Sequence, residues 1–195
     1  MTRVLVVYCH PNHESFTAAV RDRVVSVLEA RGHDLRITDL YADGFDPTMS
    51  CDERRTHKEP GIAPELQRYA DDLRWAQTLV LVYPTWWSGQ PAMLKGWVDR
   101  VWVAGVAWEL PPGANVVRPM LRNIRRIVVV TGHGSSKFVN ALEGEAGKRT
   151  VTRAMRAMSS RRTRTTWCAI YGLDNADDGA RERFLAKVER TMTRL

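Results

Sequence analysis

Residues 3–8 read Arg-Val-Leu-Val-Val-Tyr, and residues 9–17 continue as Cys-His-Pro-Asn-His-Glu-Ser-Phe-Thr. The first stretch is a nearly unbroken apolar, β-branched run, which is typical of a strand buried on both faces of a parallel sheet. The second stretch is polar and leads into residues 16–31, where apolar side chains recur at helical spacing. Ser15 and Gly32 stand where a helix cap and a helix stop are expected. The stretch therefore predicts a β-strand, a loop and an α-helix in that order.

The same alternation of apolar strands and amphipathic helices continues along the chain. Two stretches between them, 41–64 and 104–123, contain several prolines and glycines and no periodic pattern. Further strands are expected at 34–39, 78–83, 127–131 and 165–171, and further helices at 65–76, 92–103, 148–159 and 177–195. Five strands alternating with five helices, without a repeat or a linker, predict one α/β domain over 1–195 with a doubly wound parallel sheet. In such sheets ligands bind at the carboxyl ends of the strands.

Composition and charge narrow the classes of function. The chain has 195 residues, and no apolar run approaches the ~20 residues that span a bilayer. Three scattered cysteines, Cys9, Cys51 and Cys168, argue against a disulfide framework and favour a reducing, cytoplasmic compartment. Cys9, His10 and His13 match no zinc spacing, so no metal site is expected.

The net charge of +7 is concentrated in one segment. From Lys148 to Arg164 the chain has seven lysine and arginine side chains and no acidic one. Such a stripe either attracts an anionic ligand or nucleic acid, or forms a solvated helix face. It has no interleaved aromatic residues on which bases could stack. A solvated face is therefore favoured, and no nucleic-acid partner is expected.

The loop at residues 10–17 joins the first strand to the first helix. A helix N-terminus offers free backbone N–H groups and a positive dipole end, and His10, Ser15 and Thr17 add side-chain donors. The segment contains no glycine, so it is neither a P-loop nor a dinucleotide fingerprint. A phosphate-sized anion held by amides and hydroxyls is one interpretation, and simple capping of the helix by Ser15 is the other.

Two further loops follow buried strands and face the same predicted edge of the sheet. In the loop at 83–91, Trp86 and Trp87 are adjacent, and an exposed ring beside a crevice makes a wall for a planar aromatic ligand. A packing or dimer contact is the alternative. The loop at 131–136 contains two glycines, which allow the backbone to approach a ligand closely. Three such loops at one edge indicate a ligand site.

Residues 83–101 read Tyr-Pro-Thr-Trp-Trp-Ser-Gly-Gln-Pro-Ala-Met-Leu-Lys-Gly-Trp-Val-Asp-Arg-Val. This stretch closely resembles the signature of the NAD(P)H:quinone oxidoreductase family of the flavodoxin-like superfamily, and the resemblance extends over essentially the whole chain. It implies a flavodoxin-like three-layer α/β sandwich, with a five-stranded parallel sheet of order 2-1-3-4-5 and helices on both faces. It also implies a homodimeric enzyme. A bound flavin would receive hydride from NADPH or NADH and pass it to a quinone-like or other small aromatic acceptor by a ping-pong mechanism.

The resemblance also implies which residues hold the flavin. The flavin phosphates would lie on the first loop, and its ring would lie between the second and third loops. The implied cofactor-binding residues are His10, Ser15, Phe16, Thr17, Pro84, Thr85, Trp86, Trp87, Ser88, Thr131, Gly132, His133 and Gly134. The long loop at 45–54 is similar to that of members that use FAD, so FAD is preferred and FMN is the alternative. Arg149 and Arg153 favour NADPH through its 2′-phosphate.

Two departures from the family pattern bear on catalysis. The family has a Gly-Gly pair where this chain has Gly132 and His133, and a tyrosine and a histidine further along. Here the tyrosine position is Phe138, and the histidine falls around Glu143 and Gly144. Because a phenylalanine ring donates no proton, we take His133 as the substitute donor and His133 and Phe138 as the catalytic positions. The alternative function is a flavin-binding electron carrier or redox-sensing subunit with little turnover.

Gly96 stands in the middle of the helix predicted at 92–103. A glycine there costs about 1 kcal/mol relative to alanine. Its presence therefore indicates close packing at this position, for instance at a dimer contact.

Overall fold

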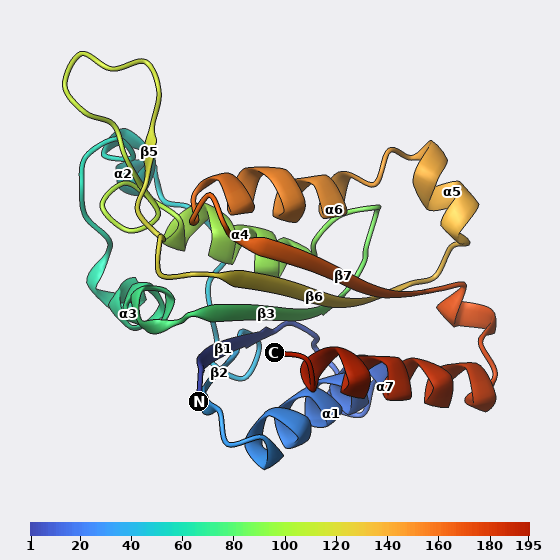
Figure 1. The fold of residues 1–195 in the computed structure, drawn as a ribbon. Helices are drawn as coiled ribbons and strands as arrows, with labels where there is room; N and C mark the ends of the chain where they lie inside the picture. The colour runs from blue at the N-terminus through green and yellow to red at the C-terminus, as the bar shows by residue number, and fades with distance from the viewer.

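A five-stranded parallel sheet lies at the centre of the computed structural model, which describes residues 1–195 (Figure 1). The strands are β1 (Arg3–Tyr8), β2 (Asp34–Asp39), β3 (Thr78–Pro84), β6 (Arg126–His133) and β7 (Arg164–Tyr171). They are ordered β2-β1-β3-β6-β7, and every pairing in this sheet is parallel. Counted among themselves these strands have the order 2-1-3-4-5, so the predicted doubly wound sheet is confirmed.

Alternate residues of each strand point to opposite faces of the sheet, so the strands build two separate cores. On one face, Val6 of β1 packs with α1 (Phe16–Ala30) and α7 (Asp178–Met192). On the other face, its neighbour Val7 packs in a larger core with the second helical layer. That layer consists of α3 (Gln67–Trp75), α4 (Ala92–Val101), and α6 (Ala146–Arg149) with its π-helical continuation Thr150–Met155.

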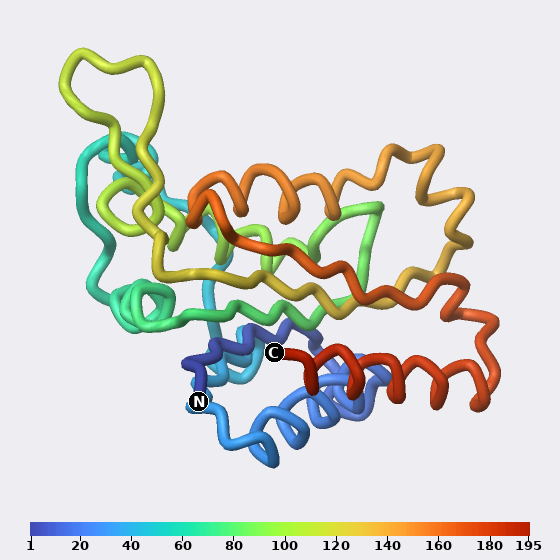
Figure 2. Tube along the Cα trace, viewed as in Figure 1, coloured from blue at the N-terminus to red at the C-terminus, as the bar shows by residue number.

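Several short elements occupy the connections between these strands and helices. They are α2 (Cys51–Arg55), α5 (Lys137–Leu142), a two-stranded antiparallel pair of β4 (Trp108–Glu109) and β5 (Arg118–Pro119), and 3₁₀ helices at Pro64–Leu66 and Leu173–Asn175. The stretches 41–64 and 104–123 are thus less irregular than expected. Ser50 and Glu53 form a capping box that starts α2. The chain between β4 and β5 projects from the body of the molecule (Figure 2).

The helix boundaries follow local signals in the sequence. The Ser15 hydroxyl accepts a hydrogen bond from the Ala18 amide at 3.2 Å, so the predicted cap of α1 is present. Gly32 follows the end of α1 with a φ of +69°, a conformation that glycine adopts without strain. No helix of the structure combines the length and the apolar character required to cross a membrane.

Gly96 of α4 lies against Pro47, in the loop that follows β2. A Cβ atom at Gly96 would overlap the backbone of Pro47. The close packing predicted at this glycine is therefore confirmed, and the partner is a loop of the same chain. The contact fixes the segment before α2 on the outer face of α4.

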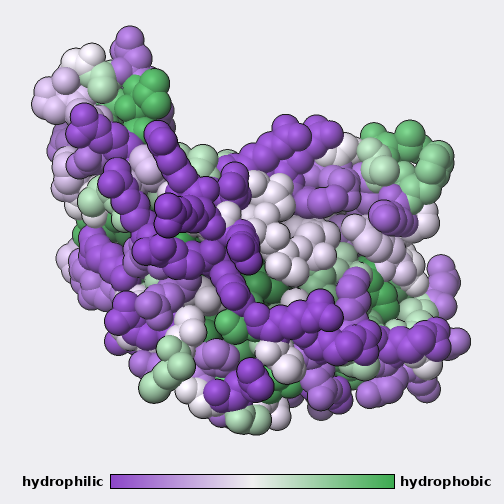
Figure 3. Space-filling view, in the orientation of Figure 1, coloured by the Kyte–Doolittle hydropathy of each residue, from purple (hydrophilic) through white to green (hydrophobic).

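Apolar areas on the surface include one over α5 and one on the segment between β4 and β5 (Figure 3). The α5 patch consists of Phe138, Val139 and Leu142, and the second area contains Leu110 and Val116. Single exposed apolar residues need no explanation, but the α5 patch gathers three on one short helix. It lies beside the edge of the sheet at which ligands bind in this type of fold.

Candidate functional site

A groove of about 640 Å³ lies at the carboxyl ends of β3 and β6. Its volume is in the range of small-molecule binding sites. The second and third loops predicted from the sequence form its walls, together with α5 and the 3₁₀ helix after β7. The lining residues are Thr85, Trp86, Trp87, Ser88, His133, Gly134, Ser135, Asn140, Glu143 and Asp174.

The wall formed by the second loop is a strained two-residue turn. Trp86 and Gly89 exchange backbone hydrogen bonds of 3.2 and 3.0 Å, which leaves Trp87 and Ser88 as the central residues. Their φ values are +48° and +56°, in the left-handed region that residues with a side chain rarely adopt. Asparagine and glycine are the usual residues of such a turn. The Trp87 side chain is fully exposed at the groove, so the strain places an uncovered indole there.

Contacts from α5 and α6 hold this turn in place. The Ser88 hydroxyl donates to the carboxylate of Glu143, which ends α5. The Ser88 carbonyl accepts from the Gly147 amide at 2.8 Å. A side chain at Gly147 would be crowded, because a Cβ would lie 3.0 Å from the Ser88 carbonyl oxygen. These contacts compensate for the unfavourable backbone of the turn.

His133, the last residue of β6, forms the floor of the groove and is only 6% exposed. Its Nδ1 lies 2.6 Å from Oδ1 of Asn140, and its Nε2 lies 3.4 Å from Oγ1 of Thr85. The imidazole stacks on the ring of Tyr171, with 4.5 Å between centroids and 21° between planes. Burial lowers the pKa of His133 below its ordinary value, although the Asn140 hydrogen bond acts in the opposite direction.

The first loop reaches the groove through one aromatic contact. The ring of His10 lies 6.3 Å from that of Trp86, and its Nδ1 accepts a 3.0 Å hydrogen bond from the Asn12 amide. Ser15 caps α1, as in the interpretation of this loop that assigns the serine a capping role. The amides of Phe16 and Thr17, the first two residues of α1, have no acceptor within the helix. These two N–H groups are the part of the loop that is free for an anion.

Eight of the expected site residues do not line the groove: His10, Ser15, Phe16 and Thr17 of the first loop, and Pro84, Thr131, Gly132 and Phe138. Pro84, Thr131 and Gly132 lie beneath it: Pro84 and Thr131 are buried, and the space in front of Gly132 is filled by Leu173. Thr131 supports the groove indirectly, because its hydroxyl lies 2.9 Å from that of Thr85. Phe138, the other expected catalytic position, lies on α5 and is not among the residues that line the groove. Residues two positions apart on a helix point in nearly opposite directions. Asn140 is therefore 3% exposed and faces the groove, whereas Phe138 is 72% exposed.

Three polar residues of the groove were not expected from the sequence. Asn140 lies on α5, a six-residue helix too short for its apolar spacing to be recognised. Glu143 was considered only as a position where a histidine was missing. Asp174 follows β7, and a Cβ at Gly134 would overlap its carboxylate. The position of Asp174 after the fifth strand is the signal for it, because all parallel strands end at the same edge of the sheet.

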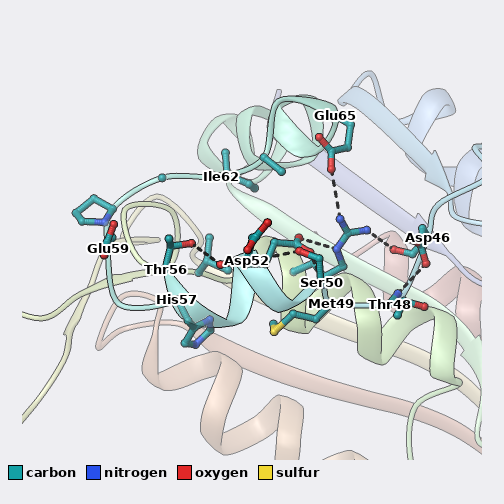
Figure 4. Close-up of a pocket in the computed structure, with 16 residues that line it drawn as sticks. Asp46, Thr48, Met49, Ser50, Asp52, Thr56, His57, Glu59, Ile62 and Glu65 are labelled. Carbon is teal, nitrogen blue, oxygen red and sulfur yellow. Dashed lines mark hydrogen bonds and ion pairs between the residues drawn. The ribbon is translucent and has the colours of Figure 1, made fainter.

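A second cavity, of about 630 Å³, lies between the loop after β2 and α4 (Figure 4). Arg100 of α4 is 7% exposed there and binds three oxygen atoms. Its Nε donates to Glu53 at 2.8 Å, and its terminal nitrogens donate to the Asp46 carbonyl at 2.6 Å and to Glu65 at 3.4 Å. Burial acts to raise the pKa of Glu53, but the hydrogen bonds from Arg100 and Ser50 outweigh it, so the pKa is lowered. This network and Gly96 anchor the loop on α4.

The sheet order, the ligand edge and the aromatic turn together define a flavodoxin-like α/β protein. The chain belongs to a protein family that is described as having a flavodoxin-like fold. The model of this family matches residues 2–193 of the chain. Among proteins with a related sequence, it is 36% identical over 108 residues to the uncharacterized NAD(P)H oxidoreductase YcaK of Escherichia coli K12. That match covers 54% of this chain and 55% of the relative. The chain thus spans about half the length of these curated relatives.

Two solved structures resemble the chain over nearly its whole length. Smu.1420 of Streptococcus mutans UA159 superposes with a TM-score of 0.87 at 28% identity, over 99% of this chain and 100% of the other. The NAD(P)H:quinone oxidoreductase of Methanothermobacter marburgensis superposes with a TM-score of 0.83 at 25% identity, over 98% and 96%. The predicted relation to NAD(P)H:quinone oxidoreductases is therefore confirmed.

Proposed function

We propose that the chain is a flavin-dependent NAD(P)H oxidoreductase that reduces a quinone-like or other small aromatic acceptor, with residues 1–195 acting as one flavin-binding domain. The observation that carries this proposal is the strained Trp87–Ser88 turn, which holds an uncovered indole at the groove. The names of the relatives support it, since one is an NAD(P)H oxidoreductase and one an NAD(P)H:quinone oxidoreductase.

The donors around the groove fit a flavin. The backbone N–H groups of Gly134 and Ser135 make no hydrogen bond within the chain and lie in the groove wall. The free amides of Phe16 and Thr17 lie at a helix N-terminus, where a phosphate is favoured. The indole of Trp87 is available for stacking on a planar ring. An aromatic wall, unpaired amides and a phosphate cradle are the features that this cofactor requires.

When bound, the flavin supplies the hydride transfer between NAD(P)H and the acceptor. The protein's own groups bind and orient the reactants. The Gly134 and Ser135 amides stabilise negative charge that develops beside them, because they are fixed before the reaction begins. NAD(P)H and the acceptor would use this same groove in turn, which gives ping-pong kinetics.

FAD is the preferred flavin, with FMN as the alternative. The preference rests on the loop at 45–54, which Gly96 and Arg100 fix on α4 in an ordered form. NADPH is preferred over NADH because of Arg149. Its guanidinium would lie 3.9 Å from a Cβ atom placed on Gly144. Gly144 is the neighbour of Glu143, which lines the groove. Lys148 pairs with Glu145, whereas Arg149 pairs with no carboxylate and is free for a 2′-phosphate.

We propose further that the protein is a homodimer. The α5 patch and the uncovered Trp87 lie around the groove, where a second copy would exclude water from them. Light scattering of the purified protein tests this directly. A dimeric mass that Leu142→Glu converts to a monomeric one supports the proposal, and a monomeric wild type overturns it.

An absorbance spectrum of the purified protein tests the function, followed by anaerobic addition of NADPH and then menadione. A flavin band that NADPH bleaches and menadione restores supports the enzyme. A flavin band that NADPH leaves unchanged favours the electron carrier or sensor, for which the outward position of Phe138 is the supporting observation. No flavin after reconstitution with FAD and FMN would reject both functions.

A further inference from the structure

The orientation of the Asn140 side chain is fixed by two backbone carbonyls. Its Nδ2 donates to the Ser136 carbonyl at 2.8 Å and approaches the Ser135 carbonyl at 3.4 Å. The nitrogen end of the amide is therefore turned toward α5. The oxygen end faces His133, with 2.6 Å between Oδ1 and Nδ1. Asn140 is 3% exposed, so water does not compete for these bonds.

This arrangement determines the tautomer of His133. An amide oxygen only accepts hydrogen bonds, so the Nδ1 facing it carries the proton. In the neutral ring Nε2 then has a lone pair, and it is the nitrogen nearer to Thr85 of the groove wall. The stacked Tyr171 and the nearby Trp167, whose ring centroid lies 6.1 Å away, keep the imidazole from turning. Any proton that His133 gains or loses is exchanged at Nε2.

We propose that His133 is the proton donor for the acceptor in the groove, and that Asn140 is the positioning residue that dedicates Nε2 to this exchange. The inference rests on the proposed oxidoreductase function and names the proton path within it. Asn140 is assigned a positioning role because its amide oxygen contacts the imidazole of His133.

The balance of the reaction requires such a donor. Reduction of a quinone to a hydroquinone takes up one hydride and one proton, and NADPH supplies only the hydride. In the imidazolium form of His133 the Nε2–H bond breaks, and a new O–H bond forms on the acceptor. The neutral ring then takes a proton from water at Nε2. Nδ1–H stays bonded to Asn140 throughout, so the cycle leaves the positioning contact intact.

The charged groups around His133 affect when it is protonated. Glu143 and Glu145 favour the imidazolium, Lys148 disfavours it, and burial disfavours it most strongly. From the other elements, Asp174 lines the groove and Tyr171 stacks on the ring. Acceptor reduction is expected to be fastest at low pH and to decline above the pKa of His133. Asn140→Asp places a carboxylate at Nδ1 and should move this decline upward by about one pH unit or more.

The test compares three proteins: wild type, Asn140→Asp and a matched control, Asn123→Asp. Asn123 also donates from Nδ2 to two carbonyls, those of Leu73 and Ala76, but it lies outside the groove. The pH dependence of menadione reduction by flavin-loaded protein should shift in Asn140→Asp and stay unchanged in Asn123→Asp. Equal shifts in both variants, or none in Asn140→Asp while wild type turns over, would overturn the proposal.

Imidazole ¹⁵N spectra of the flavin-free protein give a second readout that does not depend on turnover. The His133 signals are assigned by their loss in His133→Gln. Above the pKa we expect a protonated Nδ1 and an unprotonated Nε2, and the opposite tautomer overturns the role of Asn140. A wild type that consumes no NADPH rejects the proposed function, and the proton path with it. That failure is recognised by the absence of turnover in every variant.

Discussion

Ser88, in the strained turn, donates a hydrogen bond from its hydroxyl to the carboxylate of Glu143, 55 positions further along the chain. Both residues line the groove, one in the turn after β3 and the other at the end of α5. Their contact therefore links the aromatic wall to the helix that carries Asn140.

Ser88→Ala removes this link and leaves the turn with its backbone contacts only. We expect a loss of about 1 kcal/mol in the free energy of unfolding, because a hydrogen bond to a partly exposed carboxylate contributes about that much. Flavin affinity should fall as well, since the wall is less firmly held. Urea unfolding and flavin titration measure the two effects. Ser26→Ala, on the exposed side of α1, is the control and should change neither.

Replacing Trp87 by glycine and by alanine separates strain from ligand binding. Both changes remove the indole and should weaken flavin retention by about 1 to 3 kcal/mol, the range for stacking on an aromatic side chain. Only glycine adopts a φ of +48° without strain, so Trp87→Gly should unfold at a higher temperature than Trp87→Ala. Equilibrium dialysis of flavin and thermal melts check both. Unchanged flavin affinity would show that the ring has another role.

Glu53→Gln tests the network that anchors the loop after β2. Near neutral pH the variant should be less stable by about 1 kcal/mol, since Arg100 loses a charged hydrogen-bond partner. The lowered pKa of Glu53 sets the sign of the pH dependence. Its contribution is present above the pKa of a free glutamate, ~4.3, and is lost as the pH falls through the lowered folded value.

The measurement is urea unfolding of wild type and Glu53→Gln from pH 7 to pH 3. The difference in the free energy of unfolding between wild type and Glu53→Gln should decrease as the pH is lowered and then disappear. Glu59→Gln, which removes an exposed carboxylate without an ion-pair partner, is the control. A difference that persists at the lowest pH would mean that the carboxylate charge is not what stabilises the loop.

Arg149→Ala tests the preference for NADPH. If the guanidinium binds the 2′-phosphate, KM for NADPH should rise about tenfold, which corresponds to 1.4 kcal/mol of binding free energy. KM for NADH should stay unchanged, because NADH lacks that phosphate. Arg162→Ala, in the same basic segment but in a turn after the helix, serves as the control. Equal effects on both nucleotides would assign Arg149 a general role in the groove.

The sequence predicts the sheet well because its signals are strong and local. Buried parallel strands such as Arg3–Tyr8 are continuous apolar runs, and their observed bounds agree with those expected. The walls of the groove were also anticipated, since loops after parallel strands meet at one edge. The exposed position of Phe138 was not anticipated, because the family pattern does not indicate which side of α5 a residue occupies.

Other features of the site have no local signal. The left-handed backbone at Trp87 and Ser88 is not predictable from residues that avoid that conformation. It exists because contacts from Glu143 and Gly147, far along the chain, hold it. Asn140 could not be assigned a role either, because the pair with His133 forms only when α5 folds over the end of β6.

Gly96 has a consequence for how this protein is mapped by mutagenesis. Alanine scanning identifies a contact by deleting the atoms that make it, and at Gly96 there are none to delete. Alanine there adds a methyl group against Pro47, so the experiment measures crowding instead of loss. The same substitution improves helix propensity, and the two effects partly cancel. Alanine scanning would therefore not detect the contact at Gly96, although α4 and the loop approach each other most closely there.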